Sequence, residues 1–186
     1  LTRFSLYYPE KRDFFLESAG TFSFGSPYSA SLFYSRRIGL SEKREPIPIL
    51  GGARLTGRAG GYNLGLLSIA TERKGETPRT LFNVVRVKRD VLGSSYVGFI
   101  ATDKELADGT WNRAGGVDFT YTTSQFLGNR TLFASAYIAT TDSSDASPRG
   151  WAGRFYIDYP NDQLDMYIGH TVIGENFNPG VGFVRR

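Results

Sequence analysis

Strand-length segments follow one another from Gly51 to about Gly174, and the connections between them alternate between short and long. In the clearest segments, 113–123, 131–141, 151–159 and 164–174, apolar and polar side chains tend to alternate, which predicts strands with one apolar and one polar face. The tight turn at Gly60-Gly61, for example, is followed by a long polar loop at 73–79. Such alternation is typical of a membrane β-barrel wall, which has short turns at one rim and longer loops at the other.

These segments define the expected fold class. Most are about 9–11 residues long, the length that a tilted strand needs to cross a bilayer. They lie at 49–59, 62–71, 80–90, 96–102, 113–123, 131–141, 151–159 and 164–174, and a further first strand is expected at 31–39. The chain is therefore predicted to be all-β, an antiparallel up-and-down meander of about eight or nine strands.

Two interpretations of this meander stay open, a closed transmembrane β-barrel and a partial arc of a larger barrel. Single-chain bacterial barrels usually have an even number of strands. Residues 182–186 have the pattern of a strand that is cut short. Both considerations favour the arc.

The domain organisation follows from where the pattern begins. Residues 1–30 are predicted to be a connector with a short helix at 9–17, in which Pro9 suits the first helical position and Gly20 the end. Residues 31–186 are predicted to form the barrel meander. The chain starts at Leu1 without a signal-like segment, which we interpret as an excerpt of a longer protein.

Composition excludes several classes of protein. No run of about 18 apolar residues exists, which argues against a transmembrane helix, whereas barrel strands need only alternate apolar residues. The chain has no Cys, so disulfides and thiolate metal sites are absent. Its net charge of +4 comes from interspersed residues of both signs, so no basic stripe predicts a nucleic-acid partner. Aromatic residues near strand ends suit the girdles of a barrel: Tyr62, Tyr96, Trp111, Phe126, Trp151 and Tyr159.

The polar faces of the predicted strands carry charges of both signs. In a barrel these side chains would line an ionic lumen and contact a ligand, whereas a soluble sheet would expose them to water. The candidate ligand-binding residues are Arg54, Arg58, Arg86, Lys88, Asp118, Arg154 and Asp158.

Catalytic and metal-binding arrangements are weakly supported. His170 is the only histidine, so a Ser/His/Asp arrangement would have to use it, yet it continues the apolar alternation of its strand. Asp158 and Asp165 flank a turn and form a carboxylate pair, which mixed lumen charges also produce by chance. The run from Asp142 to Asp145 lacks the spacing of a calcium loop. No catalytic residue, metal or cofactor is therefore predicted.

Five ordered blocks resemble a known family. They are Tyr8-Pro-Glu-Lys-Arg-Asp-Phe-Phe-Leu-Glu17, Phe33-Tyr-Ser-Arg-Arg-Ile-Gly39, Pro48-Ile-Leu-Gly-Gly-Ala-Arg-Leu-Thr-Gly57, Val85-Arg-Val-Lys-Arg-Asp90 and Asn176-Phe-Asn-Pro-Gly-Val-Gly-Phe-Val-Arg185. The chain resembles the C-terminal region of bacterial outer-membrane proteins that carry an N-terminal family-9-like carbohydrate-binding domain. The resemblance implies a barrel that continues beyond Arg186 and a sugar-binding domain before Leu1.

These observations predict a segment of a bacterial outer-membrane β-barrel that serves transport or surface binding. The expected partners are outer-membrane lipid, carbohydrate-related ligands and the N-terminal carbohydrate-binding domain of the parent chain. Two alternatives stay open, an outer-membrane barrel hydrolase that uses His170 or the carboxylates, and a soluble all-β carbohydrate-binding module.

Overall fold

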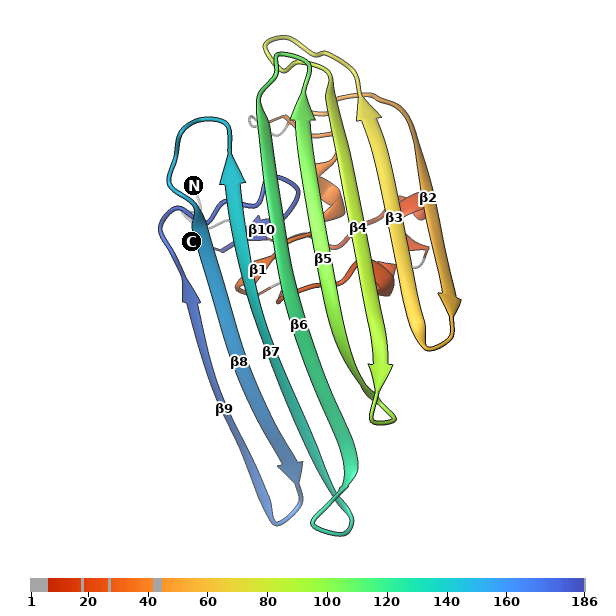
Figure 1. The fold of residues 1–186 in the computed structure, drawn as a ribbon, viewed down its shortest axis with the longest axis vertical. Coiled ribbons are helices and arrows are strands. Elements are labelled where there is room, and N and C mark those ends of the chain that lie inside the picture. Colours follow the sequence, from red (N-terminus) through yellow and green to blue (C-terminus); the bar gives the residue numbers. More distant parts are fainter. Residues whose placement is uncertain (1–6, 18, 27, 42–44, 186) are drawn as a thin grey trace.

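The dominant element of the structure, a computed structural model, is one antiparallel sheet of eight strands in the order β2 to β9 (Figure 1). The structure describes residues 7–17, 19–26, 28–41 and 45–185. The strands are β2 (Ile49–Ala59), β3 (Tyr62–Thr71), β4 (Thr80–Val91), β5 (Ser95–Leu106), β6 (Trp111–Phe126), β7 (Arg130–Ser143), β8 (Gly150–Asn161) and β9 (Leu164–Ile173). Each strand pairs with its sequence neighbours, so the predicted all-β up-and-down meander is confirmed.

The turns repeat the predicted alternation of lengths. Short connections at 60–61, 92–94, 127–129 and 162–163 lie at one end of the sheet, and the connections at 72–79, 107–110 and 144–149 lie at the other. The connection between the strands predicted at 96–102 and 113–123 is shorter than expected, since β5 extends to Leu106 and β6 begins at Trp111. Asp103 continues β5 because it pairs with Asn83 on one side and Arg113 on the other, and this ion pair offsets its charge.

The predicted strand at 31–39 is wrong. Only Ala30–Ser31 is extended (β1), and a 3-10 turn at Ser35–Arg37 (η2) follows. Leu32 and Ile38 are both fully buried, so this segment packs as an irregular chain and does not present alternating faces. The described part of the strand predicted at 182–186, residues 182–185, is also not an outer strand of the meander, and Arg186 lies outside the described residues. The extended part of this segment, Phe183–Val184 (β10), pairs with β1 in a separate two-stranded sheet.

The predicted helix at 9–17 shortens to a single turn at Asp13–Leu16 (α1). Glu10 explains the late start, because its carboxylate accepts hydrogen bonds from the backbone N–H groups of Lys11 and Arg12. Gly20 lies inside a 3-10 turn, Ala19–Phe22 (η1), and does not end the helix.

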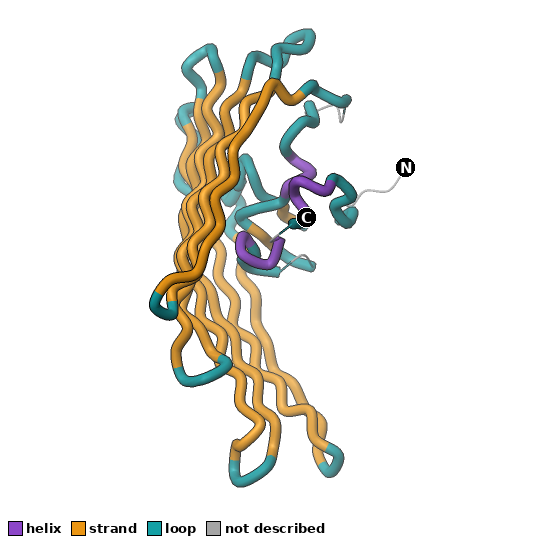
Figure 2. Tube along the Cα trace, turned by 90° about the vertical axis from the view of Figure 1, so that its right-hand side faces the viewer, coloured by secondary structure: helices purple, strands orange, loops and turns teal. Residues whose placement is uncertain are grey.

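The segments that flank the meander form a second layer, which we call the inner layer: the described residues from 7 to 48 and from 174 to 185. It covers only one face of the sheet, the inner face (Figure 2). The core lies between the two layers, where Phe22, Phe24 and Leu32 pack with sheet residues such as Leu67 and Ile100.

Two glycines of the sheet allow this close approach. A Cβ atom on Gly65 would lie 2.9 Å from the Phe22 ring, and one on Gly116 would lie 2.5 Å from the Phe24 ring. Both rings therefore pack directly on the backbone of the sheet.

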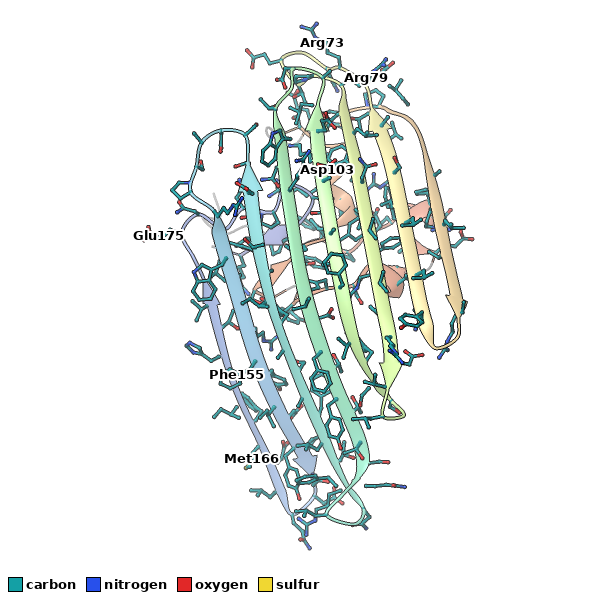
Figure 3. All side chains as sticks on the ribbon, viewed as in Figure 1. Arg73, Arg79, Asp103, Phe155, Met166 and Glu175 are labelled. Atoms are coloured by element: carbon teal, nitrogen blue, oxygen red, sulfur yellow. The ribbon has the colours of Figure 1, made fainter. Side chains whose placement is uncertain are left out.

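The opposite face of the sheet, the outer face, is apolar and uncovered. Figure 3 labels Phe155 and Met166 on its lower part and Arg73 and Arg79 at the long-loop end. Its exposed apolar side chains come from all eight strands: Leu55, Leu64, Leu66, Leu81, Val85, Val97, Phe99, Val117, Phe119, Ile138, Trp151, Phe155, Ile157, Met166, Ile168 and Val172. Strands β2 and β9 each have one strand neighbour, so the sheet is open among the described residues. None of the described helices is long and apolar enough to cross a membrane.

Candidate functional site

The seven predicted ligand-binding residues share the inner face. Four of them, Arg58, Lys88, Asp118 and Arg154, fall on one line across the sheet, because the register joins them through Asn63, Gly98 and Tyr137. The alternation of the strands therefore placed them on a common face, as expected from the sequence. Their contacts differ from those of an open lumen.

Arg86 and Asp118 form a buried bidentate ion pair. The Nη1 and Nη2 atoms of Arg86 donate to the two carboxylate oxygens of Asp118 at 2.6 and 2.7 Å, and the two side chains are 0% and 8% exposed. The Phe24 ring of the inner layer lies 5.5 Å from the guanidinium carbon. Gly98 leaves the space for this pair, since a Cβ there would lie 2.4 Å from Asp118 Oδ1. The pair is thus enclosed by the chain itself.

Arg54 and Lys88 bind the inner layer. Arg54 donates to the backbone oxygens of Phe14 and Glu17 and pairs with the Glu17 carboxylate. Lys88 donates to the backbone oxygen of Gly20 at 2.8 Å and to Ser23 Oγ at 2.9 Å. Both cations satisfy polar groups of an irregular segment, a role that needs no external ligand.

The remaining three candidates are Arg58, Arg154 and Asp158. Arg58 pairs with Asp90, and the Arg154 guanidinium lies 4.9 Å from the centre of the Tyr156 ring. Asp158 stands opposite Tyr167 of β9. A cavity of about 80 Å³, which is room for a few water molecules only, is lined by Arg154, Asp118 and Phe24 among others. Ligand binding by these seven residues stays a prediction.

The catalytic alternatives gain no support from the geometry. His170 lies on the outer face, with its ring 6.2 Å from Phe155. Asp145 accepts hydrogen bonds from Ser143 and Ser147, and Asp142 pairs with Arg149, so this loop uses its oxygens internally. Among the described residues no three His, Cys, Asp or Glu side chains are grouped as metal ligands.

A groove of about 970 Å³ lies where the inner layer meets the long-loop end of the sheet. One wall comes from the inner layer, with Tyr8, Tyr34, Arg36 and Arg37, and the other from the ends of β4 and β5 and the 72–79 loop. Sequence reasoning did not select these residues as a site. The only signals were the adjacent basic pair Arg36-Arg37 and the resemblance blocks in which Tyr8 and Tyr34 lie.

The groove wall is ordered by contacts within the inner layer. The Tyr34 hydroxyl accepts from the Tyr8 backbone N–H at 2.9 Å and donates to the Tyr8 carbonyl at 2.8 Å. Close to Tyr8 in the chain, the Glu10 carboxylate forms an ion pair with the Arg12 guanidinium at 2.7 Å. Burial raises the pKa of the Glu10 carboxyl, but hydrogen bonds from the Arg12 side chain, from Ser35 and from two backbone N–H groups outweigh burial and lower this pKa to about 2.

No family model, curated protein or solved structure matches this chain.

Proposed function

We propose that this chain is part of the wall of a bacterial outer-membrane β-barrel, with the inner layer inside the barrel, and that it serves transport or surface binding of polar, carbohydrate-related ligands. The observation that carries the proposal is the apolar outer face, which runs across all eight strands without a covering layer. Exposed apolar patches of this extent mark membrane or protein interaction sites.

The two faces of the sheet differ as a barrel wall requires. The outer face offers lipid many apolar side chains, with the Asp103–Arg113 ion pair near its long-loop end, whereas the inner face carries the buried Arg86–Asp118 pair and the polar contacts to the inner layer. Backbone groups in a bilayer need partners within the protein, and antiparallel strands supply them to each other. The connections at 72–79 and 144–149, longer than those at the other end, fit the outward-facing loops of such a barrel.

The inner layer favours an arc of a larger barrel over a closed barrel of eight strands. The interior of an eight-stranded barrel is just wide enough for side chains or one small ligand. Here the inner face holds two stretches of backbone, joined by β1 and β10. Further strands beside β2 and β9 would enclose this layer and satisfy both sheet edges. The resemblance to the barrel region of proteins with a family-9-like carbohydrate-binding domain agrees with this proposal.

Charge substitutions on the two faces test the membrane proposal. Ile138→Arg places a charge on the exposed outer face of β7, and Thr122→Arg places the same charge on the inner face of β6. A charge facing the middle of the bilayer costs about 2–4 kcal/mol. We expect Ile138→Arg to reduce insertion into phosphatidylcholine vesicles at least tenfold and Thr122→Arg to change it less than twofold.

The measurement is the fraction of chain that floats with the vesicles and gains protease protection. A wild-type chain that stays folded and soluble without detergent or lipid would contradict the membrane proposal and support the soluble binding module. Equal effects of the two arginines would contradict the assignment of the faces.

A further inference from the structure

We infer that the groove at the long-loop end binds an oligosaccharide. This inference rests on the proposed function, because it names the ligand site within the proposed barrel. The inner layer occupies the middle of the inner face, where Arg54, Arg86, Lys88 and Asp118 are committed to internal contacts. The groove, at about 970 Å³, is much larger than the cavity of about 80 Å³ beside Arg154. Its volume lies within the range of about 300–1,000 Å³ that is usual for small-molecule sites.

Aromatic rings form part of the inner-layer wall of the groove. Tyr34 and Phe183 pack against each other with ring centres 5.5 Å apart, and the two hydrogen bonds to the Tyr8 backbone fix the Tyr34 ring. Tyr8 itself is 51% exposed. Flat aromatic surfaces suit the C–H faces of pyranose rings. Because Tyr34 is already fixed, binding would cost little side-chain entropy there.

Hydrogen-bond donors stand beside these rings. Arg36 donates through Nη1 to the Pro9 carbonyl at 2.8 Å, and Arg37 donates through Nε to the Gly182 carbonyl at 3.0 Å. Among the described residues neither guanidinium has a carboxylate partner, and each keeps further N–H donors for a ligand. Arg36 also lies 5.5 Å from the centre of the Tyr8 ring, so a donor and an aromatic surface are adjacent.

Acceptors complete the lining. Glu45 and Asp108 both border the groove. Asp108 Oδ1 accepts from the Thr110 backbone and hydroxyl, which leaves Oδ2 as an acceptor. A sugar hydroxyl both donates and accepts, so a lining with guanidinium donors and carboxylate acceptors suits a polyhydroxylated ligand. A multiply charged anion would meet the carboxylates, and an apolar ligand would leave these charged groups without water.

The test is binding of defined oligosaccharides to the full chain in detergent micelles. Cellotetraose, maltotetraose and tetragalacturonate are the probes, tetra-alanine is the negative control, and calorimetric titration gives the Kd. We expect at least one neutral tetrasaccharide to bind with a Kd below about 1 mM, since weaker binding supplies less than about 4 kcal/mol. Tyr8→Ala and Arg36→Gln should each raise this Kd about tenfold, the effect of losing one good contact.

Matched control variants lie away from the groove. Tyr28→Ala removes a tyrosine that is 80% exposed, and Arg149→Gln removes an exposed arginine of the 144–149 loop. Both should leave the Kd unchanged, and near-ultraviolet circular dichroism should show that all four variants are folded. Binding that the groove variants do not weaken, or no binding of any tetrasaccharide at 10-fold the expected Kd, would overturn the inference. Vesicle insertion is measured separately, so failure of the membrane proposal and failure of oligosaccharide binding at the groove are distinguishable.

Discussion

The Arg86–Asp118 pair shows how one residue of this sheet depends on another. Both side chains are buried, and each carboxylate oxygen of Asp118 accepts from a different nitrogen of Arg86. A buried charge without its partner is costly, whereas replacing both partners by apolar residues is often nearly neutral.

Removing one partner should therefore destabilise the chain strongly. We expect Asp118→Ala to lower the free energy of unfolding by about 3–5 kcal/mol, because it leaves the Arg86 charge buried and unpaired. The double variant Arg86→Met with Asp118→Leu should recover most of this loss. Urea unfolding in detergent, followed by circular dichroism, measures both. If the double variant were as unstable as Asp118→Ala, packing and not charge would be the cause.

Glu10 makes the inner layer sensitive to acid. Its pKa is about 2 in the folded chain against 4.5 ordinarily, so the folded state favours the ionised form. This contribution is fully present above about pH 5 and is lost as the pH falls toward 2.

We expect Glu10→Gln to lower the free energy of unfolding by about 1–2 kcal/mol at pH 7, allowing for partial solvent screening, and the difference from wild type to shrink between pH 5 and pH 2. Urea midpoints across this pH range give the measurement. Glu72→Gln, in an exposed loop, removes the same charge without these contacts. A difference that does not change with pH would show that Glu10 acts through shape alone.

At the scale of elements, the inner layer packs closely on the sheet because glycines of the sheet have no side chain at the contact. Gly116 faces Phe24 and Leu32, whereas its neighbour Gly115 points to the outer face, where a Cβ would have only the Ile100 carbonyl at 3.8 Å. The two glycines form a matched pair on one strand, one beneath the inner layer and one away from it.

Adding a side chain at Gly116 should loosen the inner layer. Gly116→Val forces the Phe24 ring away from β6, and overpacking of this kind costs about 1–3 kcal/mol. We expect chymotrypsin to cut at Phe22 or Phe24 roughly tenfold faster in this variant. Gly115→Val should leave the cleavage rate unchanged. Equal rates in the two variants would mean that the inner layer does not depend on this contact.

At the scale of the whole molecule, the sheet is a two-faced wall with both edges open among the described residues. Residues that precede the meander in the chain and residues that follow it together cover its inner face, and β1 pairs with β10 within this cover. Its outer face has no such cover. A soluble protein would expose this apolar surface at a large cost, and a bilayer removes that cost.

The sequence by itself determined the meander. Alternation along 49–59, 62–71, 131–141 and 151–159 set the strands, and turn residues such as Gly60-Gly61 set their ends within a few positions. Alternation also placed Arg58, Lys88, Asp118 and Arg154 on one face, because successive strand side chains point to opposite sides.

Only the tertiary structure decided what covers that face. The strand predicted at 31–39 became an irregular segment, because burial of Leu32 and Ile38 in the core outweighs the local pattern. The helix predicted at 9–17 shortened to the turn at Asp13–Leu16. The same packing gave Arg54, Arg86, Lys88 and Asp118 internal contacts and left the groove beside Tyr34 open. Contacts between residues far apart in the chain carry no local signal, so alternation could predict the wall but not its inner layer.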